Sequence, residues 1–435
     1  MLPLHAGAKL VVRPLAAAAL VDDEPCVADN GVVVIGGHMR RSLEGGLLAI
    51  AATSLLLLAS PASAVAASPR AAPSIGKQLA ELKGSDTLAG DAVGVSVAIS
   101  GTTAIVGAPG SAKDAGRAYV FTSTVTGWQQ AAELKGSDTV AADFFGYAVA
   151  ISGTTVVVSA PGFAKNAGRA YIFARTATGW KQAAELRGSD TVAGDYFGDS
   201  VATSGTDAIV GADDHTKSAG RAYVFTSTAA GWKQAAELKG SDTVANDGFG
   251  YAVAISGTTA IVGAPDHAKD AGRAYVFTNT AAGWRQAAEL KGSDTVADNG
   301  FGVSVAISGK TAIAGAPGFS KAAGRAYIFA RTATGWKQAA ELKGSDTVAS
   351  DDFGYTVAIS NTTAVAGAPN FSKAAGRAYV FTNTATDWKQ AAELKGSDTV
   401  AADYFGYSVA ISGTTAVVGA DGHAKSAGRA YVFVA

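Results

Sequence analysis

The chain is short of cysteine and of charge. Its 435 residues hold one cysteine, Cys26, and only 16% of them are charged. A single thiol cannot form an intramolecular disulfide, so the hydrophobic core has to provide the stability. Residues 1–64 hold 4 Lys or Arg and 5 Asp or Glu of the chain's 35 and 36, which leaves 31 of each sign after residue 64. This balance argues against a nucleic acid or an anionic membrane recognised through net charge.

Long apolar segments are also missing, apart from one short run near the start. Met39-Arg40-Arg41 precedes an apolar run from Leu47 to Ala59, and the small residues 60–66 follow it. This order is typical of a secretory signal peptide, and the run is too short for a permanent membrane span.

These features predict how the chain is processed. We expect 1–38 to be a mis-called N-terminal extension, with an unusually long basic n-region as the alternative, and 39–66 to be the signal peptide, followed by a linker at 67–76. The protein is expected to be secreted, extracellular or associated with the cell surface, without membrane insertion.

Glycine and repetition are what the sequence has in abundance. The 53 glycines are not arranged as a triplet repeat, which favours short strands joined by tight turns. The tetrapeptide Gly-Ser-Asp-Thr recurs every 52 residues, beginning at Gly84, Gly136, Gly188, Gly240, Gly292, Gly344 and Gly396. A period of this length indicates a propeller or a solenoid.

Each copy contains four apolar runs of strand length. In the second copy they are Phe145–Ser152, Thr154–Ala160, Arg169–Phe173 and Trp180–Leu186. Four short antiparallel strands make one propeller blade, and no helical periodicity competes. We therefore predict an all-β fold, a seven-bladed β-propeller of four-stranded antiparallel blades over residues 77–435.

The two ends of the repeated region predict how the ring closes. The last copy stops at Phe433 and lacks its fourth run, whereas an extra copy of that run's end, Gln78 to Leu82, precedes the first repeat. The N-terminal strand is therefore expected to complete the last blade, which hides the sheet edges at both termini.

The repeats resemble the FG-GAP repeat family, which forms the seven-bladed propeller of the integrin α-subunit head and recurs in secreted bacterial proteins. Gly-Ala-Pro stands at 107–109, 263–265, 315–317 and 367–369. The second copy departs with Ser159, and the third and seventh have Asp213 and Asp421 in place of proline. Phe-Gly stands at 145–146, 197–198, 249–250, 301–302, 353–354 and 405–406, with Val93-Gly94 in the first copy.

The resemblance implies calcium sites only where the loop between the first two strands carries several carboxylates. Here that loop is Ser-Gly-Thr-Thr, as at 152–155, and Asp207 of the third copy adds a single carboxylate. We therefore expect no metal and no cofactor.

Some charged positions recur in every copy and are expected at one end of the propeller, the other end being nearly uncharged. They can form a binding face, or they can pair with one another as solvated ion pairs of little energetic weight. The lysines are Lys113, Lys165, Lys217, Lys269, Lys321, Lys373 and Lys425, the arginines lie four residues after each, and the aspartates are those of Gly-Ser-Asp-Thr.

Residues that break the repeat are the more specific candidates for a ligand site. The third copy departs most, because it adds Asp199, Asp213, Asp214 and His215. The candidate ligand-binding residues are these four together with Lys217, Lys165 and Lys269. Against a site, His267 and His423 occupy the same loop position as His215 and no metal-binding spacing is present.

Catalytic residues are not evident. After residue 66 the chain has three histidines in equivalent loops and no cysteine, so neither a Ser-His-Asp nor a Cys-His arrangement is expected. The paired carboxylates Asp351 and Asp352 are expected to lack the apolar pocket that raises a pKa. The six tryptophans, one at the start of each outer strand, are either sugar platforms or half-buried packing residues.

The sequence thus predicts a secreted, non-enzymatic binding or adhesion module, expected as a monomer, that engages an extracellular protein or polysaccharide through the charged face. Two alternatives remain open. One is a secreted hydrolase or lyase, which requires carboxylates or histidines in the central channel, where the inner strands place mainly Ala, Val, Ile and Ser. The other is a structural surface protein without a specific ligand.

Overall fold

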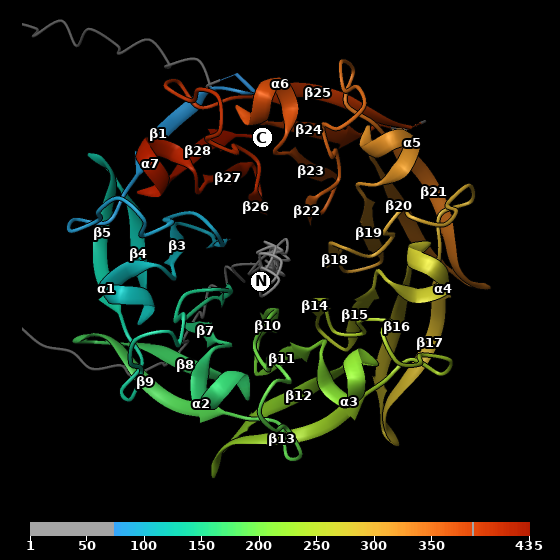
Figure 1. Ribbon diagram of the computed structural model, residues 1–435, viewed down its shortest axis with the longest axis horizontal. Coiled ribbons are helices and arrows are strands. Elements are labelled where there is room, and N and C mark those ends of the chain that lie inside the picture. The colour runs from blue at the N-terminus through green and yellow to red at the C-terminus, as the bar shows by residue number, and fades with distance from the viewer. Residues whose placement is uncertain (1–73, 385–386) are drawn as a thin grey trace, which may run out of the picture. The chain divides into compact units, whose positions relative to one another are not determined.

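Seven four-stranded antiparallel sheets are arranged as blades around a central axis (Figure 1). The computed structural model describes residues 74–384 and 387–435. The predicted all-β, seven-bladed propeller is confirmed. The expected extension, signal peptide and most of the linker lie outside the described residues.

Every blade has the same strand order, from the axis outward. The inner strands are β2 (Val97–Ser100), β6 (Val149–Ser152), β10 (Val201–Ser204), β14 (Ala252–Ser256), β18 (Val305–Ser308), β22 (Thr356–Ser360) and β26 (Ser408–Ser412). The second strands are β3 (Thr103–Ala108), β7 (Thr155–Ala160), β11 (Asp207–Ala212), β15 (Thr259–Ala264), β19 (Thr311–Ala316), β23 (Thr363–Ala368) and β27 (Thr415–Ala420). The third strands are β4 (Arg117–Thr124), β8 (Arg169–Thr176), β12 (Arg221–Thr228), β16 (Arg273–Thr280), β20 (Arg325–Thr332), β24 (Arg377–Asn383) and β28 (Arg429–Val434). The outer strands are β5 (Gly127–Leu134), β9 (Gly179–Leu186), β13 (Gly231–Leu238), β17 (Gly283–Leu290), β21 (Gly335–Leu342), β25 (Trp388–Leu394) and β1 (Gln78–Leu82). Blades 1 to 7 follow the seven sequence copies.

The N-terminal strand completes blade 7, as predicted. β1 pairs antiparallel with β28, placing Glu81 opposite Tyr431 and Leu82 opposite Ala430. The same strand supplies Gln78, whose side-chain oxygen accepts from Ser397 N at 3.0 Å, and Glu81, which binds Arg429 at 2.6 Å. The last blade thus has the contacts that a single continuous repeat makes in the others.

The predicted inner strands begin too early. β6 starts at Val149, not at Phe145, because Gly146 has φ +92° and turns the chain before the strand. Phe145 instead forms a parallel bridge to Gly116 of the preceding blade.

The two family signatures meet at a close approach of neighbouring blades. A Cβ on Gly107, the glycine of Gly-Ala-Pro in blade 1, would lie 2.0 Å from the carbonyl oxygen of Gly146, the glycine of Phe-Gly in blade 2. A Cβ at Gly107 would not fit this approach of the two backbones, and blade 2, which has Ser159 at the equivalent position, is the exception. The repeated glycines therefore set the distance between blades near the axis.

A second contact links the blades at the opposite end of the inner strands. Ser100 Oγ accepts a hydrogen bond from Gly153 N of the next blade at 3.0 Å. The equivalent bond is present between every pair of neighbouring blades, and the one from Gly101 N to Ser412 Oγ closes the ring. The turn after each inner strand, Ser-Gly-Thr-Thr in blade 2, thus contributes to a ring of hydrogen bonds.

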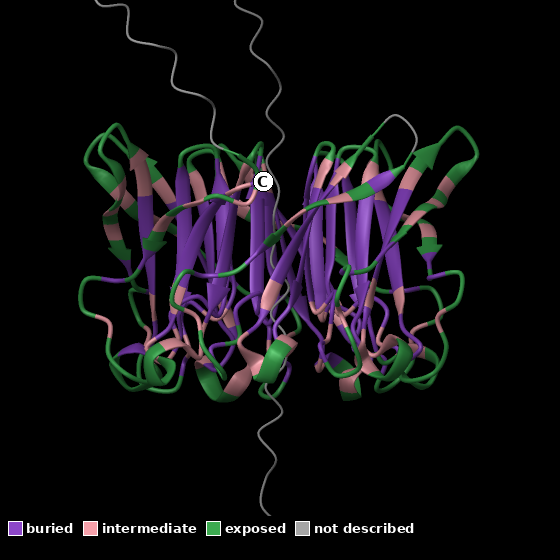
Figure 2. Cartoon of the chain, turned by 90° about the horizontal axis from the view of Figure 1, so that it is seen from above, coloured by how far each residue is buried: buried purple, intermediate pink, exposed green. Residues whose placement is uncertain are grey.

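A tight turn follows the second strand of each blade, and these turns share one end of the propeller, called the turn face below (Figures 1 and 2). They are α1 (Ser111–Asp114), α2 (Phe163–Asn166), α3 (His215–Ser218), α4 (His267–Asp270), α5 (Phe319–Ala322), α6 (Phe371–Ala374) and α7 (His423–Ser426). Their central residues have positive φ, so each is a left-handed turn and not a right-handed helix.

Contacts with the next blade hold the left-handed turns in place. In α2, the carbonyl oxygens of Lys165 and Asn166 accept from the backbone N–H groups of Gly194 and Tyr196. Positive φ at consecutive residues with a Cβ is unfavourable, so it persists only where such contacts stabilise it.

The core lies between the blades. The inner and second strands are buried along nearly their whole length, whereas the outer strands alternate exposed and partly buried residues (Figure 2). Phe145 packs edge-on against Tyr171 and Phe173, and the other Phe-Gly blades repeat this contact. Within the described residues, no helix has the length and apolar character of a membrane span.

Candidate functional site

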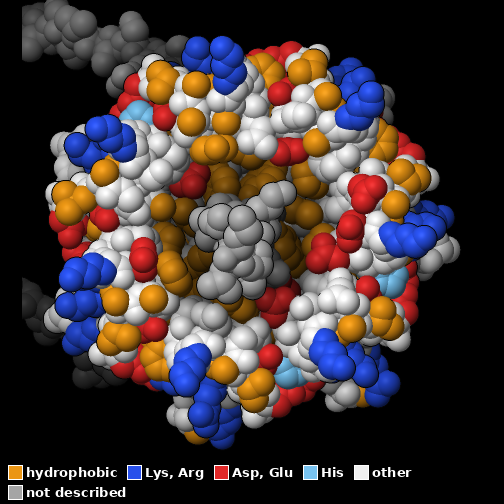
Figure 3. All heavy atoms as spheres, in the orientation of Figure 1, with side chains coloured by type: hydrophobic (Ala, Val, Ile, Leu, Met, Phe, Trp, Pro, Cys, Tyr) orange, Lys and Arg blue, Asp and Glu red, His pale blue; other side chains and the backbone are white. Residues whose placement is uncertain are grey.

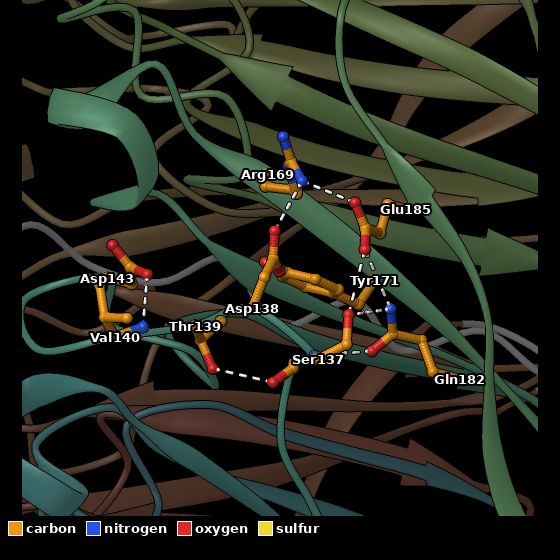
Figure 4. A network of polar contacts seen from close by, with 10 residues as sticks. Ser137, Asp138, Thr139, Val140, Asp143, Arg169, Tyr171, Gln182 and Glu185 are labelled. Atoms are coloured by element: carbon orange, nitrogen blue, oxygen red, sulfur yellow. Dashed lines mark hydrogen bonds and ion pairs between the residues drawn. The ribbon is translucent and has the colours of Figure 1, made fainter.

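A polar network lies beneath the turn face of each blade, and Figure 4 shows the one in blade 2. In blade 2, the Tyr171 hydroxyl donates to Asp138 Oδ1 at 2.7 Å and Ser137 N donates to Gln182 Oε1 at 2.9 Å. Arg169 binds Glu185 at 2.6 Å and reaches Asp138 Oδ2 at 2.9 Å. Burial and the hydrogen bond to Asp138 raise the pKa of Tyr171, so its hydroxyl remains a donor.

The network is architectural, because all seven blades have it. Each Gly-Ser-Asp-Thr aspartate accepts from the third-strand tyrosine at 2.7–2.8 Å. Each third-strand arginine binds an outer-strand glutamate within 2.7 Å. The aspartates therefore fasten the inter-blade loop to the third strand, and the arginines fasten the third strand to the outer strand. The ion-pair interpretation had the recurring residues pairing with one another, and among the described residues only Arg169 and Asp138 do so.

The recurring lysines behave differently. Lys165, Lys217 and Lys269 are exposed at the centres of their left-handed turns, as are the four equivalent lysines. Among the residues described, the ion pairs of the turn face involve arginine and histidine but none of these lysines. Figure 3 shows Lys and Arg in separate groups around the rim, with acidic side chains also nearer the centre.

The opposite end is not nearly uncharged, contrary to the prediction. Lys181 and Lys233 are exposed near the starts of β9 and β13, and Arg175 is exposed near the end of β8. Because the third and outer strands meet in a hairpin away from the turn face, these cations lie toward the other end.

The third-copy candidates do not form one cluster of free groups. Asp199 and Asp213 are buried, and Asp214 accepts from Ser218 Oγ at 2.9 Å. His215 is buried and points toward two aspartates, with Nδ1 2.9 Å from Asp195 Oδ2 and Nε2 3.5 Å from Asp190 Oδ2.

The histidine arrangement recurs where histidine recurs. His267 and His423 each lie 2.9 Å from the equivalent aspartates, Asp247 and Asp403. Where phenylalanine occupies this position, as at Phe163, the repeat arginine lies over its ring instead. These side chains hold the turn against the inter-blade loop. The described residues contain no group of three or more His, Cys, Asp or Glu placed to hold a metal ion.

The tryptophans pack as the half-buried interpretation predicted. Trp128, Trp180, Trp232, Trp284 and Trp336 are partly buried against the core, and Trp388 is buried.

Sequence reasoning missed a pocket at the mouth of the channel, between blades 6 and 7. This channel-mouth pocket has a volume of about 380 Å³. Its walls are Asp352, Tyr355, Pro369, Asn370, Tyr404, Tyr407 and Asp421.

Three local arrangements build the pocket. Tyr355 and Tyr407 immediately precede the inner strands β22 and β26, and their rings lie 5.3 Å apart. Asp352 has φ +57° and accepts a hydrogen bond from the Asn370 side chain. Asp421 follows β27 directly. Residues just outside the inner strands, rather than the strands themselves, thus bring carboxylates and tyrosines to the channel.

The two carboxyl groups of the pocket have raised pKa values. Burial raises the pKa of Asp352 to about 6 and that of Asp421 to about 7. Burial also raises the pKa of Asp351. The expectation that Asp351 and Asp352 lack an environment that raises a pKa was therefore wrong. Such carboxyl groups accept hydrogen bonds, bind cations or exchange protons near neutral pH.

The signal for this pocket was present in the alignment of the copies. Asn370 and Asp421 depart from the majority residue at their positions, and Asp352 is the only acidic residue among the seven copies at its position. The departures are spread over two copies, so their meeting at one place became visible only in the folded ring.

The match to a protein family agrees with the fold. The FG-GAP repeat family matches seven segments, 77–121, 128–173, 180–225, 232–277, 284–329, 336–381 and 388–433. Among solved structures, the chain is similar to the crystal structure of Saccharomyces cerevisiae Sqt1, with 12% identity and a TM-score of 0.46 over 83% of this chain and 100% of that one. No curated protein matches the chain.

Proposed function

The chain belongs to the FG-GAP repeat family, and from this premise we propose that it is a secreted, non-enzymatic binding or adhesion module whose turn face engages an extracellular protein or polysaccharide. A propeller of this family is suited to binding and scaffolding in general.

The observation that carries the proposal is the ring of exposed lysines. The arginines and aspartates of each repeat are engaged within the blade, whereas the lysines project from turns whose backbones are bonded to the next blade. A fixed backbone reduces the conformational entropy that a binding surface loses. Seven regularly placed cations suit a partner with repeated anionic groups, although the net charge is near zero.

Binding of two anionic polymers tests this proposal. Polygalacturonate represents an acidic polysaccharide and polyglutamate an acidic polypeptide. We expect one of them to bind with an affinity that falls as salt rises, because exposed ion pairs are screened. Replacing Lys165, Lys217 and Lys269 with Gln should weaken binding roughly tenfold, since each exposed pair contributes little.

The chain offers a matched control with the same loss of charge. Lys181, Lys233 and Lys337 lie near the starts of the outer strands, away from the turn face. Their replacement with Gln should leave the affinity within about twofold. Equal weakening by both triple variants, or binding of neither polymer, would refute the turn face as an anion-binding surface.

One observation favours the alternative of a hydrolase. Hydrolysis of a glycosidic bond commonly uses two carboxyl groups, one of which holds its proton near neutral pH. Asp352 and Asp421 are two such carboxyl groups with pKa values raised toward neutral pH. Release of reducing ends from polygalacturonate, abolished by Asp421→Asn, would establish this alternative, whereas binding without turnover supports the module.

A further inference from the structure

Blades 6 and 7 depart from the repeat at the positions that surround the channel-mouth pocket. Asp352 stands where other blades have Ala, Phe, Tyr or Gly, and Asp421 stands where five blades have proline. Asn370 replaces a Gly or Asp. Tyr355 and Tyr407 form the one pair of tyrosines on neighbouring blades at the residue after the Phe-Gly dipeptide. Packing of the ring does not require this combination, because no other pair of neighbouring blades has it, although blade 3 has Asp213 at the position of Asp421.

The pocket is acidic and has no cation in its walls. Two aspartates, an asparagine, three tyrosines and a proline line it. Asp421 Oδ1 is buried and accepts no hydrogen bond from any described residue, whereas Asp352 accepts from Asn370. A buried carboxylate is unfavourable unless hydrogen-bond donors or an opposite charge compensate it. Asp421 Oδ1 therefore lacks a donor, and the walls of the pocket supply no positive charge.

We propose that the channel-mouth pocket binds an ammonium group carried by the partner of the turn face. The inference rests on the proposed function, because it assigns a second contact to the same partner. An ammonium group supplies three donors and one positive charge, which suit the carboxylate oxygens of Asp352 and Asp421. The rings of Tyr355, Tyr404 and Tyr407 add surfaces that attract cations.

A neutral sugar fits this pocket less well. Its hydroxyl groups would satisfy Asp421 Oδ1, but they would bring no charge to a site with two carboxylates. Burial is the main cause that raises the pKa of both aspartates, and no cation acts against it. A ligand that carries the missing charge gains the larger interaction.

The same ammonium chemistry occurs on a lysine side chain and on an amino sugar. Nα-acetyl-lysine amide and glucosamine represent the two sources, and N-acetylglucosamine is the neutral counterpart. Isothermal titration of the whole propeller with each compound distinguishes them. We expect one ammonium compound to bind, N-acetylglucosamine to give no heat of binding, and the affinity to rise from pH 5 to pH 7 as the carboxyl groups lose their protons while the ligand keeps its own.

Variants that restore the repeat test the pocket without threatening the fold. Asp421→Pro and Asp352→Gly install residues that other blades carry at these positions, and Asp421→Asn preserves the shape of the side chain. Each should weaken binding of the ammonium compound about tenfold, through loss of a charge-assisted hydrogen bond. Asp207→Thr also restores the repeat and removes a carboxylate, but at the opposite end of β11, so it should leave the affinity unchanged.

The two proposals fail separately. Binding of neither ammonium compound, equal binding of N-acetylglucosamine, or unchanged affinity in Asp421→Pro and Asp421→Asn would overturn the pocket assignment. The triple lysine variant should still bind the ammonium compound, because its substitutions lie outside the pocket. Suppose that this variant binds the ammonium compound and that neither triple variant binds the polymers more weakly than the original protein. The turn face proposal then fails and the pocket assignment stands.

Discussion

Closure of the ring by β1 predicts the cost of replacing one leucine near the N-terminus. Leu82 is 1% exposed and is packed in the core of blade 7. Replacing a buried leucine with alanine costs about 2–5 kcal/mol, because the apolar contacts are lost and a cavity remains. Leu82→Ala should therefore lower the free energy of unfolding by about 2–5 kcal/mol, measured by urea denaturation followed by tryptophan fluorescence.

The equivalent leucine of blade 5 provides the control. Leu342 is 2% exposed at the same position of β21, a strand inside the chain. If β1 is fastened as firmly as an internal strand, Leu342→Ala and Leu82→Ala should cost similar amounts. A loss below about 0.5 kcal/mol for Leu82→Ala alone, the size expected for a surface substitution, would refute closure by this strand.

Three further predictions concern protonation, the repeated network and metal. Burial raises the pKa of Asp421 from 3.8 to about 7. Between these two pH values the folded protein holds a proton that the unfolded chain releases, so the free energy of unfolding falls as the pH rises, by at most about 4 kcal/mol in all. The stability of Asp421→Asn relative to the original should therefore grow between pH 4 and pH 8 in urea titrations, and a constant difference would contradict the burial argument. Tyr275→Phe removes a 2.8 Å hydrogen bond to Asp242 and should cost about 1–2 kcal/mol in the same assay, whereas no loss would show that the bond adds nothing. A chelator should leave the thermal melting curve unmoved, and a drop of many degrees would reveal metal sites.

Much of the fold was predictable because the information repeats along the chain. The spacing of Gly-Ser-Asp-Thr predicted seven blades, and the extra run that ends at Leu82 predicted closure. The start of the inner strand was not predicted, since Phe145 and Gly146 read as a continuation of the apolar run. Their bridge to the preceding blade is a contact between copies, which the pattern within one copy does not reveal.

The sequence could predict that a site would lie where copies depart from the repeat, but it did not predict which copies would form it. The rule that departures from the repeat mark a site directed attention to the third copy, where His215 is held between two aspartates. The same rule applied to the sixth and seventh copies leads to Asp352 and Asp421. Their raised pKa values depend on burial in the folded ring, and the residues next to them in the sequence do not reveal that burial.

The sequence by itself determined the number of blades, the order of strands and the strand that closes the ring, because these follow from a period and from a partial repeat at each end. Only the tertiary structure decided which charged residues form hydrogen bonds or ion pairs within a blade and which are exposed to solvent. It placed Asp352 and Asp421 in the walls of one pocket, since the closing ring brings the loops of neighbouring blades together at the axis. The removal of water at that point gives these two carboxyl groups properties that the exposed carboxylates of the repeat do not share.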